Sequence, residues 1–196
     1  MTETGRPRNV SDLRQLEHEG RCPDFLFFWG HQPGPGGELG PGCLSQWWPA
    51  PFTIDGVTFP TAEHFMMVSK ARLFGDELGA ASILADPSPT GAKALGRAIR
   101  AYDDEVWAAS RYGIVVEGNL AKFGQNPALL EYLIATGDSV LVEASPTDRV
   151  WGIGLAAGDE GARRPVHWKG MNLLGFALMD ARDRLAEGTV AAARSA

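Results

Sequence analysis

The sequence predicts an α+β fold, a predominantly helical single domain with a β-hairpin and a few short strands. Helical patterns dominate residues 61–135, whereas apolar β-rich runs are short and scattered, at 25–29, 52–59 and 139–144. Such an arrangement argues against regularly alternating βαβ units. With 196 residues and 44% hydrophobic content the chain can bury a full core, and no repeat or linker divides it.

Polar segments flank the predicted domain, which spans residues 23–187. Residues 1–22 are charged, with a short amphipathic pattern at Leu13 and Leu16, and are expected to form a mobile arm or a peripheral helix. Residues 188–196 are expected to form a frayed tail. The start of the chain lacks an apolar leader, and no run approaches the roughly 20 apolar residues that span a bilayer. We therefore expect a cytoplasmic protein without membrane contact.

The first strand is expected at residues 25–29, and a Gly- and Pro-rich loop, HQPGPGGELGPG, follows at 31–42. The loop connects FFWGH to CLSQWW. It either covers a substrate or is a disordered insertion without a role.

A β-hairpin is expected in PFTIDGVTFP, because Asp55 and Gly56 supply the positive φ angles of a type I′ turn. Thr61 is a suitable N-cap for a helix that runs to about Phe74, where Gly75 supplies a stop. This helix is the segment in which chemistry-bearing residues concentrate.

Glu63, Met67 and Lys70 follow i, i+4, i+7 spacing on that helix and border its apolar stripe. One interpretation is structural, with Glu63 complementing the helix dipole and Lys70 solvated. The other is a reaction site that pairs a carboxylate with an amine.

The remaining elements follow from caps and apolar spacing. Helices are expected at about 75–84, 88–100, 103–123, 127–135 and 172–185, a strand at 139–144, and irregular chain at 148–168.

Charge argues against a protein held to nucleic acid mainly by phosphate neutralisation, because the net charge is −6 and the pI is near 5.2. A small-molecule partner fits better, and nucleic acid is a weaker alternative. Lys93, Arg97 and Arg100 lie at i, i+4, i+7 on the helix AKALGRAIR. They could hold a 5-phosphate or form a solvated face.

No metal or other cofactor is expected. Cys22 and Cys43 have no zinc-finger spacing, and the four histidines show no ligand motif. No GxGxxG or P-loop is present, so water is the expected co-substrate.

The segment LSQWWPAPFTIDGVTFPTAEHFMMVSKA resembles the signature of the NADAR family, also called YbiA-like. Its members carry an LSNF-like segment, a hairpin and a helix reading S/T-x-E-H-Y/F-x-x-x-x-K. AKALGRAIR, then Trp107, AKFGQNPALLEYLIATGDSVLVEASPTDRVWGIGL and WKGMNLLGFALMDARDRL resemble later family blocks in the same order. The resemblance covers roughly residues 25–185, and it implies a YbiA-like fold and N-glycosidase activity.

By this resemblance, the catalytic residues are Glu63, Lys70, Trp107 and Asp148. Cleaving a C–N glycosidic bond needs a carboxylate near the anomeric carbon, a group that stabilises the leaving base and a platform for that base. Glu63 and Asp148 match family acids, and Trp107 matches a family aromatic. Taken alone, Asp148 would be a loop-capping residue and Trp107 a core residue.

Lys70 admits two roles under the resemblance. It is either an electrostatic partner for Glu63 or a nucleophile that forms a Schiff base with C1 of the opened sugar. The second role needs a depressed pKa, which a nearby Glu63 carboxylate would oppose.

The resemblance also implies a set of substrate-binding residues, namely Trp29, Gly30, Ser45, Trp48, His64, Arg97, Trp151, Gly152 and Asn172. Asn172 could bind a sugar hydroxyl or cap the last helix. Gln46-Trp47 departs from the LSNF pattern, and Ile153 stands where some members carry an acid.

Three functions are consistent with these residues. The leading one is hydrolysis of early phosphoribosylamino-pyrimidine intermediates of riboflavin biosynthesis, with release of ribose 5-phosphate. The second is removal of ADP-ribose from guanine in nucleic acid. The third is a non-catalytic module that binds NAD or ADP-ribose.

Overall fold

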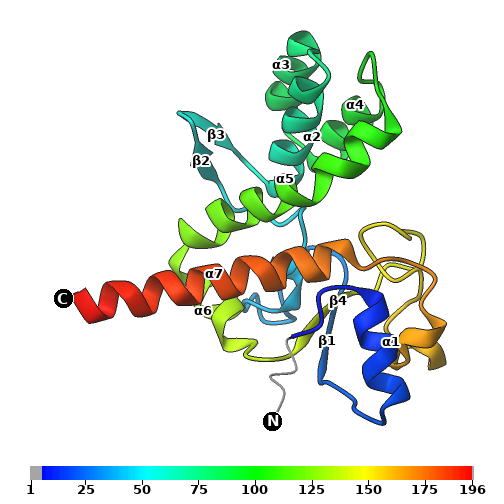
Figure 1. Ribbon diagram of the computed structural model, residues 1–196. Coiled ribbons are helices and arrows are strands. Elements are labelled where there is room, and N and C mark those ends of the chain that lie inside the picture. Colours follow the sequence, from blue (N-terminus) through cyan, green and yellow to red (C-terminus); the bar gives the residue numbers. More distant parts are fainter. Residues whose placement is uncertain (1–5, 196) are drawn as a thin grey trace.

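The computed structural model describes residues 6–195, with side chains placed up to residue 188 (Figure 1). The helices are α1 (Val10–His18), α2 (Ala62–Leu73), α3 (Glu77–Ala85), α4 (Pro89–Arg97), α5 (Asp104–Gly124), α6 (Pro127–Ala135) and α7 (Leu173–Ser195). The strands are β1 (Phe25–Phe28), β2 (Phe52–Ile54), β3 (Val57–Phe59) and β4 (Val140–Glu143). Three short 3-10 turns add η1 (Pro41–Leu44), η2 (Glu160–Arg163) and η3 (Pro165–His167). The α+β prediction is confirmed.

The long helices α5 and α7 pack against each other across the middle of the molecule (Figure 1). Helices α2, α3 and α4 and the β2–β3 hairpin lie on one side of this pair, and β1, β4 and α1 lie on the other. Helix α5 also packs on α2, and α7 packs on β4. The two halves are therefore joined by α5 and α7.

Two separate two-stranded sheets account for the four strands. The β2–β3 hairpin turns at Asp55 and Gly56, whose φ angles of 49° and 76° fit the predicted type I′ turn. Strands β1 and β4 pair in parallel, with Phe28 opposite Glu143. This pairing, between segments far apart in sequence, sets the chain after β1 beside the chain after β4.

Local capping explains the helix that carries Glu63. Thr61 is the N-cap of α2 and accepts from the His64 amide, while Gly75 follows the helix with a φ of 70°. Both predicted ends of α2 are confirmed to within one residue.

Two helix ends differ from the sequence predictions. Helix α4 ends at Arg97, so Arg100 is not on it. Helix α7 continues to Ser195, past the end expected near Leu185, and Ala196 lies outside the described residues. In the N-terminal segment, residues 10–18 form a peripheral helix and Leu13 is fully buried, whereas residues 1–5 lie outside the described part.

The Gly-rich loop folds on itself. The Gly34 amide donates to the Glu38 carbonyl at 2.9 Å, and the Glu38 carboxylate accepts from the Gly36 amide at 2.8 Å. No helix of the described chain has the length and apolar character needed to cross a membrane.

Candidate active site

A cavity of about 700 Å³ opens between the two halves of the molecule. Residues of α2, α4 and α5 line one side, and residues of β4 and of the loops after β1, η1 and β4 line the other. Nine of the residues singled out from the sequence are brought together here: Trp29, Gly30, Ser45, Glu63, Lys70, Arg97, Trp107, Asp148 and Trp151.

Both the backbone and the side chain of Glu63 have contacts that hold it at the cavity wall. Its amide donates to the Gln46 carbonyl at 3.0 Å, and the carboxyl group is 2% exposed. The Trp47 side chain hydrogen-bonds this carboxyl, whereas Oε1 has no partner among the described residues. Burial raises the pKa of Glu63 to about 7, against the opposing effects of Lys93 and the Trp47 hydrogen bond.

Asp148 lies in the loop after β4, where it caps a turn and also lines the cavity. Its Oδ1 accepts from the amides of Val150 and Trp151, at 2.8 Å each, and so caps the turn. The same residue lines the cavity, and its charge raises the pKa of Glu63. A loop cap therefore also brings a carboxylate into the site.

Glu143, the last residue of β4, is a third carboxyl at this cavity, and the sequence analysis missed it. Burial raises its pKa to about 8, Asp148 and Glu63 add to the shift, and Lys93 opposes it. The sequence did contain a signal for Glu143. It is an acidic residue at the end of an apolar strand, and it stands only five positions before Asp148, so its side chain should lie near the loop that carries Asp148. We call Glu63, Glu143 and Asp148 the acidic cluster.

The contacts of Lys70 are with groups outside the acidic cluster. Its Nζ donates to the Gly96 carbonyl at 2.9 Å and lies 4.2 Å from the ring centroid of Tyr102 and 5.5 Å from that of Trp107. Burial lowers the pKa of Lys70, and Asp104 opposes this effect. Among the ion pairs of the described residues, none joins Lys70 to Glu63.

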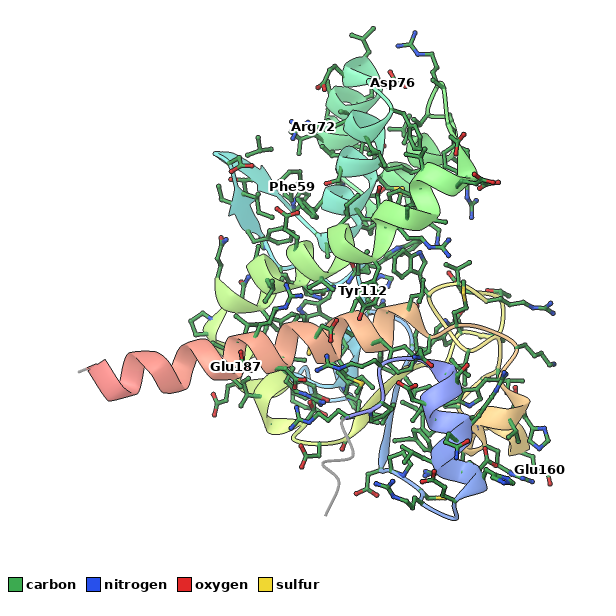
Figure 2. The ribbon with its side chains drawn as sticks, viewed as in Figure 1. Phe59, Arg72, Asp76, Tyr112, Glu160 and Glu187 are labelled. Carbon is green, nitrogen blue, oxygen red and sulfur yellow. The ribbon has the colours of Figure 1, made fainter. Side chains whose placement is uncertain are left out.

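The cation that lowers the pKa of Glu63 most is Lys93 of α4, and Arg97 lowers it less. Both line the cavity, as the predicted phosphate cluster requires. Arg100 does not line the cavity with them. It lies beyond the end of α4, and the Arg100 guanidinium donates to Asp76 Oδ1 at 2.9 Å. Asp76 lies at the outer end of α2 and α3 (Figure 2).

Trp47, and not the predicted Trp48, faces the cavity. Trp48 packs half-buried against the core, whereas the Trp47 ring lies 5.6 Å from that of His31 and 5.7 Å from Lys93 Nζ. Gln46 and Trp47, which depart from the LSNF pattern, therefore both lie at the wall of the cavity.

Three further residues that were predicted to bind substrate, His64, Gly152 and Asn172, do not line the cavity. Each of them has a role within the fold. His64 is fully buried, with Nδ1 bonded to Thr61 Oγ1 at 2.8 Å and Nε2 to the Asp86 carbonyl at 3.0 Å. A Cβ on Gly152 would come within 2.8 Å of the Glu143 carbonyl oxygen, so this glycine permits the close approach of two chain segments.

Asn172, the third, joins α7 to β4 instead of meeting a sugar. Its Oδ1 accepts from the Glu143 amide and its Nδ2 donates to the Leu141 carbonyl, both at 2.9 Å. It is fully buried, with a φ of 52° that asparagine tolerates better than most residues. Neither of the two roles considered for its side chain is the observed one.

Further cavity residues were not singled out from the sequence. They are Tyr102, Asp104, Arg111, Ser145 and Thr147. Arg111 Nε has no hydrogen-bond partner among the described residues. Its neighbour Tyr112 donates to Asp180 of α7 at 2.7 Å, at the junction of α5 and α7 (Figure 2). Within the described chain, no group of three His, Cys, Asp or Glu residues is placed to hold a metal ion.

The cavity thus has two chemically distinct ends. The acidic cluster with Lys93 and Arg97 forms one, and Lys70 with aromatic rings forms the other. Partly neutralised carboxyls next to aromatic walls suit proton transfer to and from a flat heterocycle joined to a sugar.

Comparison with known proteins agrees with this geometry. The model of the NADAR domain family matches residues 27–186. An N-glycosidase of Acanthamoeba polyphaga mimivirus is 39% identical over 81% of this chain and 95% of its own length. N-glycosidase YbiA of Escherichia coli is 33% identical over 69% of this chain and 76% of its own.

The NMR structure of E. coli YbiA superimposes with a TM-score of 0.68 at 28% identity, covering 86% of this chain and 89% of that one. The family model spans all the residues that line the cavity. The chain belongs to the NADAR family.

Proposed function

We propose that this protein hydrolyses the C–N glycosidic bond of early phosphoribosylamino-pyrimidine intermediates of riboflavin biosynthesis and releases ribose 5-phosphate. The activity, hydrolysis of an N-glycosyl bond, is the one named for its relatives in the mimivirus and in E. coli. The substrate is our inference from the family resemblance and from the character of the cavity. A cytoplasmic location, without a membrane or a cofactor, belongs to the same proposal.

The observation that carries the proposal is the buried Glu63 carboxyl beside Asp148, inside an aromatic cavity. A carboxyl with a pKa of about 7 exchanges protons readily at neutral pH. Asp148, in contact with the turn amides, supplies negative charge for an oxocarbenium-like sugar. Glycosidases commonly divide these two roles between two carboxyl groups.

The remaining walls fit a phosphorylated ribose carrying a flat base. A cavity of about 700 Å³ is within the usual range for small-molecule sites, and Trp47, Trp107 and Trp151 offer stacking surfaces. Lys93 and Arg97 are the cations placed to neutralise a phosphate. This is a small-molecule site, in keeping with the acidic net charge.

The test is release of ribose 5-phosphate from the early pyrimidine intermediates, run beside ADP-ribosylated guanine in DNA. Glu63→Gln should lower kcat/KM on the pyrimidines by roughly 10²- to 10⁴-fold, the usual contribution of acid–base catalysis. Glu117→Gln, on the exposed surface of α5, is the matched control and should match the wild type.

Each other outcome points to one of the alternatives. Activity on the DNA alone would replace the substrate with ADP-ribosylated guanine. Silence on both substrates, together with binding of NAD or ADP-ribose, would leave a non-catalytic module.

A further inference from the structure

We propose that Glu143 is the general acid that protonates the departing heterocycle. This rests on the proposed N-glycosidase function and assigns a catalytic role that the motif comparison did not supply. Glu143 reaches the cavity from β4, whereas Glu63 reaches it from α2.

The backbone of Glu143 is fixed on both sides, which gives its side chain a defined position. Its amide donates to Asn172 Oδ1 at 2.9 Å, and its carbonyl accepts from the Ile153 amide at 3.0 Å. The next residue, Ala144, donates to the Phe28 carbonyl at 2.9 Å and continues the link to β1. A rigid strand end is a precise support for a catalytic group.

One oxygen of its carboxyl has no hydrogen-bond partner among the described residues to stabilise an anion. Oε2 is buried and unpartnered among the described residues, and a buried carboxylate without partners is costly. A protonated carboxyl in the same place is a donor whose acceptor is still missing. A nitrogen of a bound heterocycle would supply that acceptor.

The charges around the acidic cluster divide the roles between its members. Glu63 (α2) is influenced by two cations of α4, Lys93 and Arg97, by the Trp47 hydrogen bond and by the Asp148 carboxyl. Glu143 is influenced by one cation, Lys93, and by the two carboxyls Asp148 and Glu63. Of these two glutamates, Glu143 has fewer neighbours that stabilise the anion, so we assign the transferable proton to it.

The reaction step balances as follows. The C1–N bond breaks, its electron pair goes to the nitrogen, and the proton of Glu143 moves to the heterocycle. Water then adds to C1, and its proton goes to the Glu63 carboxylate. Solvent returns the enzyme to its starting state by moving a net proton from Glu63 to Glu143, so one water is consumed per bond.

The experiment compares two substrates that differ in their need for an acid. An aminopyrimidine must gain a proton as it leaves, whereas the nicotinamide of nicotinamide mononucleotide departs as a neutral molecule. Glu143→Gln should lower kcat/KM on the phosphoribosylamino-pyrimidine by about 10²- to 10⁴-fold and on nicotinamide mononucleotide by less than about 10-fold. Glu63→Gln should be impaired on both.

The pH profile provides a second readout that a purely structural role would not change. Wild-type kcat/KM on the pyrimidine should fall as pH rises above about 8, the pKa of Glu143, and Glu143→Gln should lack this alkaline limb. Equal losses on both substrates, or an unchanged alkaline limb, would overturn the assignment.

A spectroscopic measurement separates this inference from the substrate proposal. Infrared difference spectra of wild type and Glu143→Gln at pH 7 should show a protonated-carboxyl band that only the wild type has. If the wild type cleaves nicotinamide mononucleotide but not the pyrimidines, the substrate proposal fails, and the band decides for Glu143. Absence of the band would refute a neutral Glu143 whatever the substrate.

Discussion

Glu63 shows how tertiary burial reverses a local preference. It lies in the first turn of α2, where the helix dipole favours a carboxylate. In the folded protein its pKa nevertheless rises to about 7, because burial outweighs that effect and the nearby cations. From the sequence alone Glu63 would be a surface acid that stabilises its helix. In the folded protein it is a buried carboxyl whose ionised form costs free energy.

The raised pKa predicts a pH-dependent stability cost. The folded pKa of about 7 lies above the ordinary glutamate pKa of 4.5, so the folded state binds more protons between these values. Stability from this group thus falls as pH rises from about 4.5 to 7, by up to roughly 3 kcal/mol. Glu63→Gln should raise Tm relative to wild type at pH 8 and not at pH 4.

Thermal unfolding at constant ionic strength checks this expectation. Glu117→Gln, which alters an exposed carboxyl of α5, should shift Tm little at either pH. A Glu63→Gln offset that is the same at pH 4 and pH 8 would contradict the linkage argument.

Lys70 offers a second residue-scale prediction, because its two roles respond differently to a retained charge. If Lys70 acts only through its charge, Lys70→Arg should keep most activity and Lys70→Met should lose it. If Lys70 forms a Schiff base, both variants should lose activity, and borohydride should trap a sugar on the wild type during turnover.

Burial lowers the pKa of Lys70, but the bond to the Gly96 carbonyl, the Tyr102 ring and Asp104 all stabilise its charged form. We therefore expect Lys70→Arg to keep most activity, in line with direct addition of water to C1. An inactive Lys70→Arg together with an adduct trapped by borohydride and seen by mass spectrometry would instead assign the Schiff base.

At the scale of elements, a buried lysine fixes the cavity wall to α5. Lys122 is fully buried, and its Nζ donates to the carbonyls of Cys43 at 2.6 Å and Ser45 at 2.8 Å. Burial lowers the pKa of Lys122 to about 7. The lysine thus ties the end of η1, and with it the cavity residue Ser45, to α5.

Lys122→Met should destabilise the protein by roughly 1–3 kcal/mol, because the Cys43 carbonyl loses the lysine donor and the Ser45 carbonyl keeps only the Trp48 amide. It should also lower kcat/KM, since Ser45 lines the cavity. Urea unfolding measures the first effect, and Lys169→Met, at an exposed position, is the control. A variant as stable as wild type would show that Lys122 contributes no net stability.

At the scale of the whole molecule, the N-terminal segment is attached to the domain. Arg6 pairs with Asp138 and Asp183, and Arg8 pairs with Asp180. Arg14 of α1 donates to two carbonyls of the η3 region. The partners of these arginines lie on α7, in the η3 region and in the loop between α6 and β4, and no described residue before Phe25 lines the cavity.

Deleting residues 1–20 should therefore lower Tm by several degrees and leave kcat/KM within about twofold, when assayed well below the transition. The loss arises because buried Leu13 and the Arg14 hydrogen bonds are removed. A large fall in kcat/KM with an unchanged Tm would instead mean that the N-terminal segment serves the site. The result tests our proposal that the catalytic unit is residues 23–187.

Elements and motif residues followed from the sequence because they depend on local chemistry. The type I′ turn at Asp55 and Gly56, the Thr61 cap and the ends of α6 were predicted from adjacent residues. Glu63, Lys70, Trp107 and Asp148 were named from the family resemblance, and the structure brings all four to one cavity.

Only the tertiary structure decided which side chains meet there. Parallel pairing of β1 with β4 places Glu143 at the cavity, and no local pattern specifies a contact over that sequence distance. His64 and Asn172 matched the motif, yet their hydrogen bonds are consumed within the fold. The sequence by itself determined the helices, the hairpin and the candidate acids. Packing determined their pKa values and partners, because burial and neighbouring charge exist only after the distant segments have met.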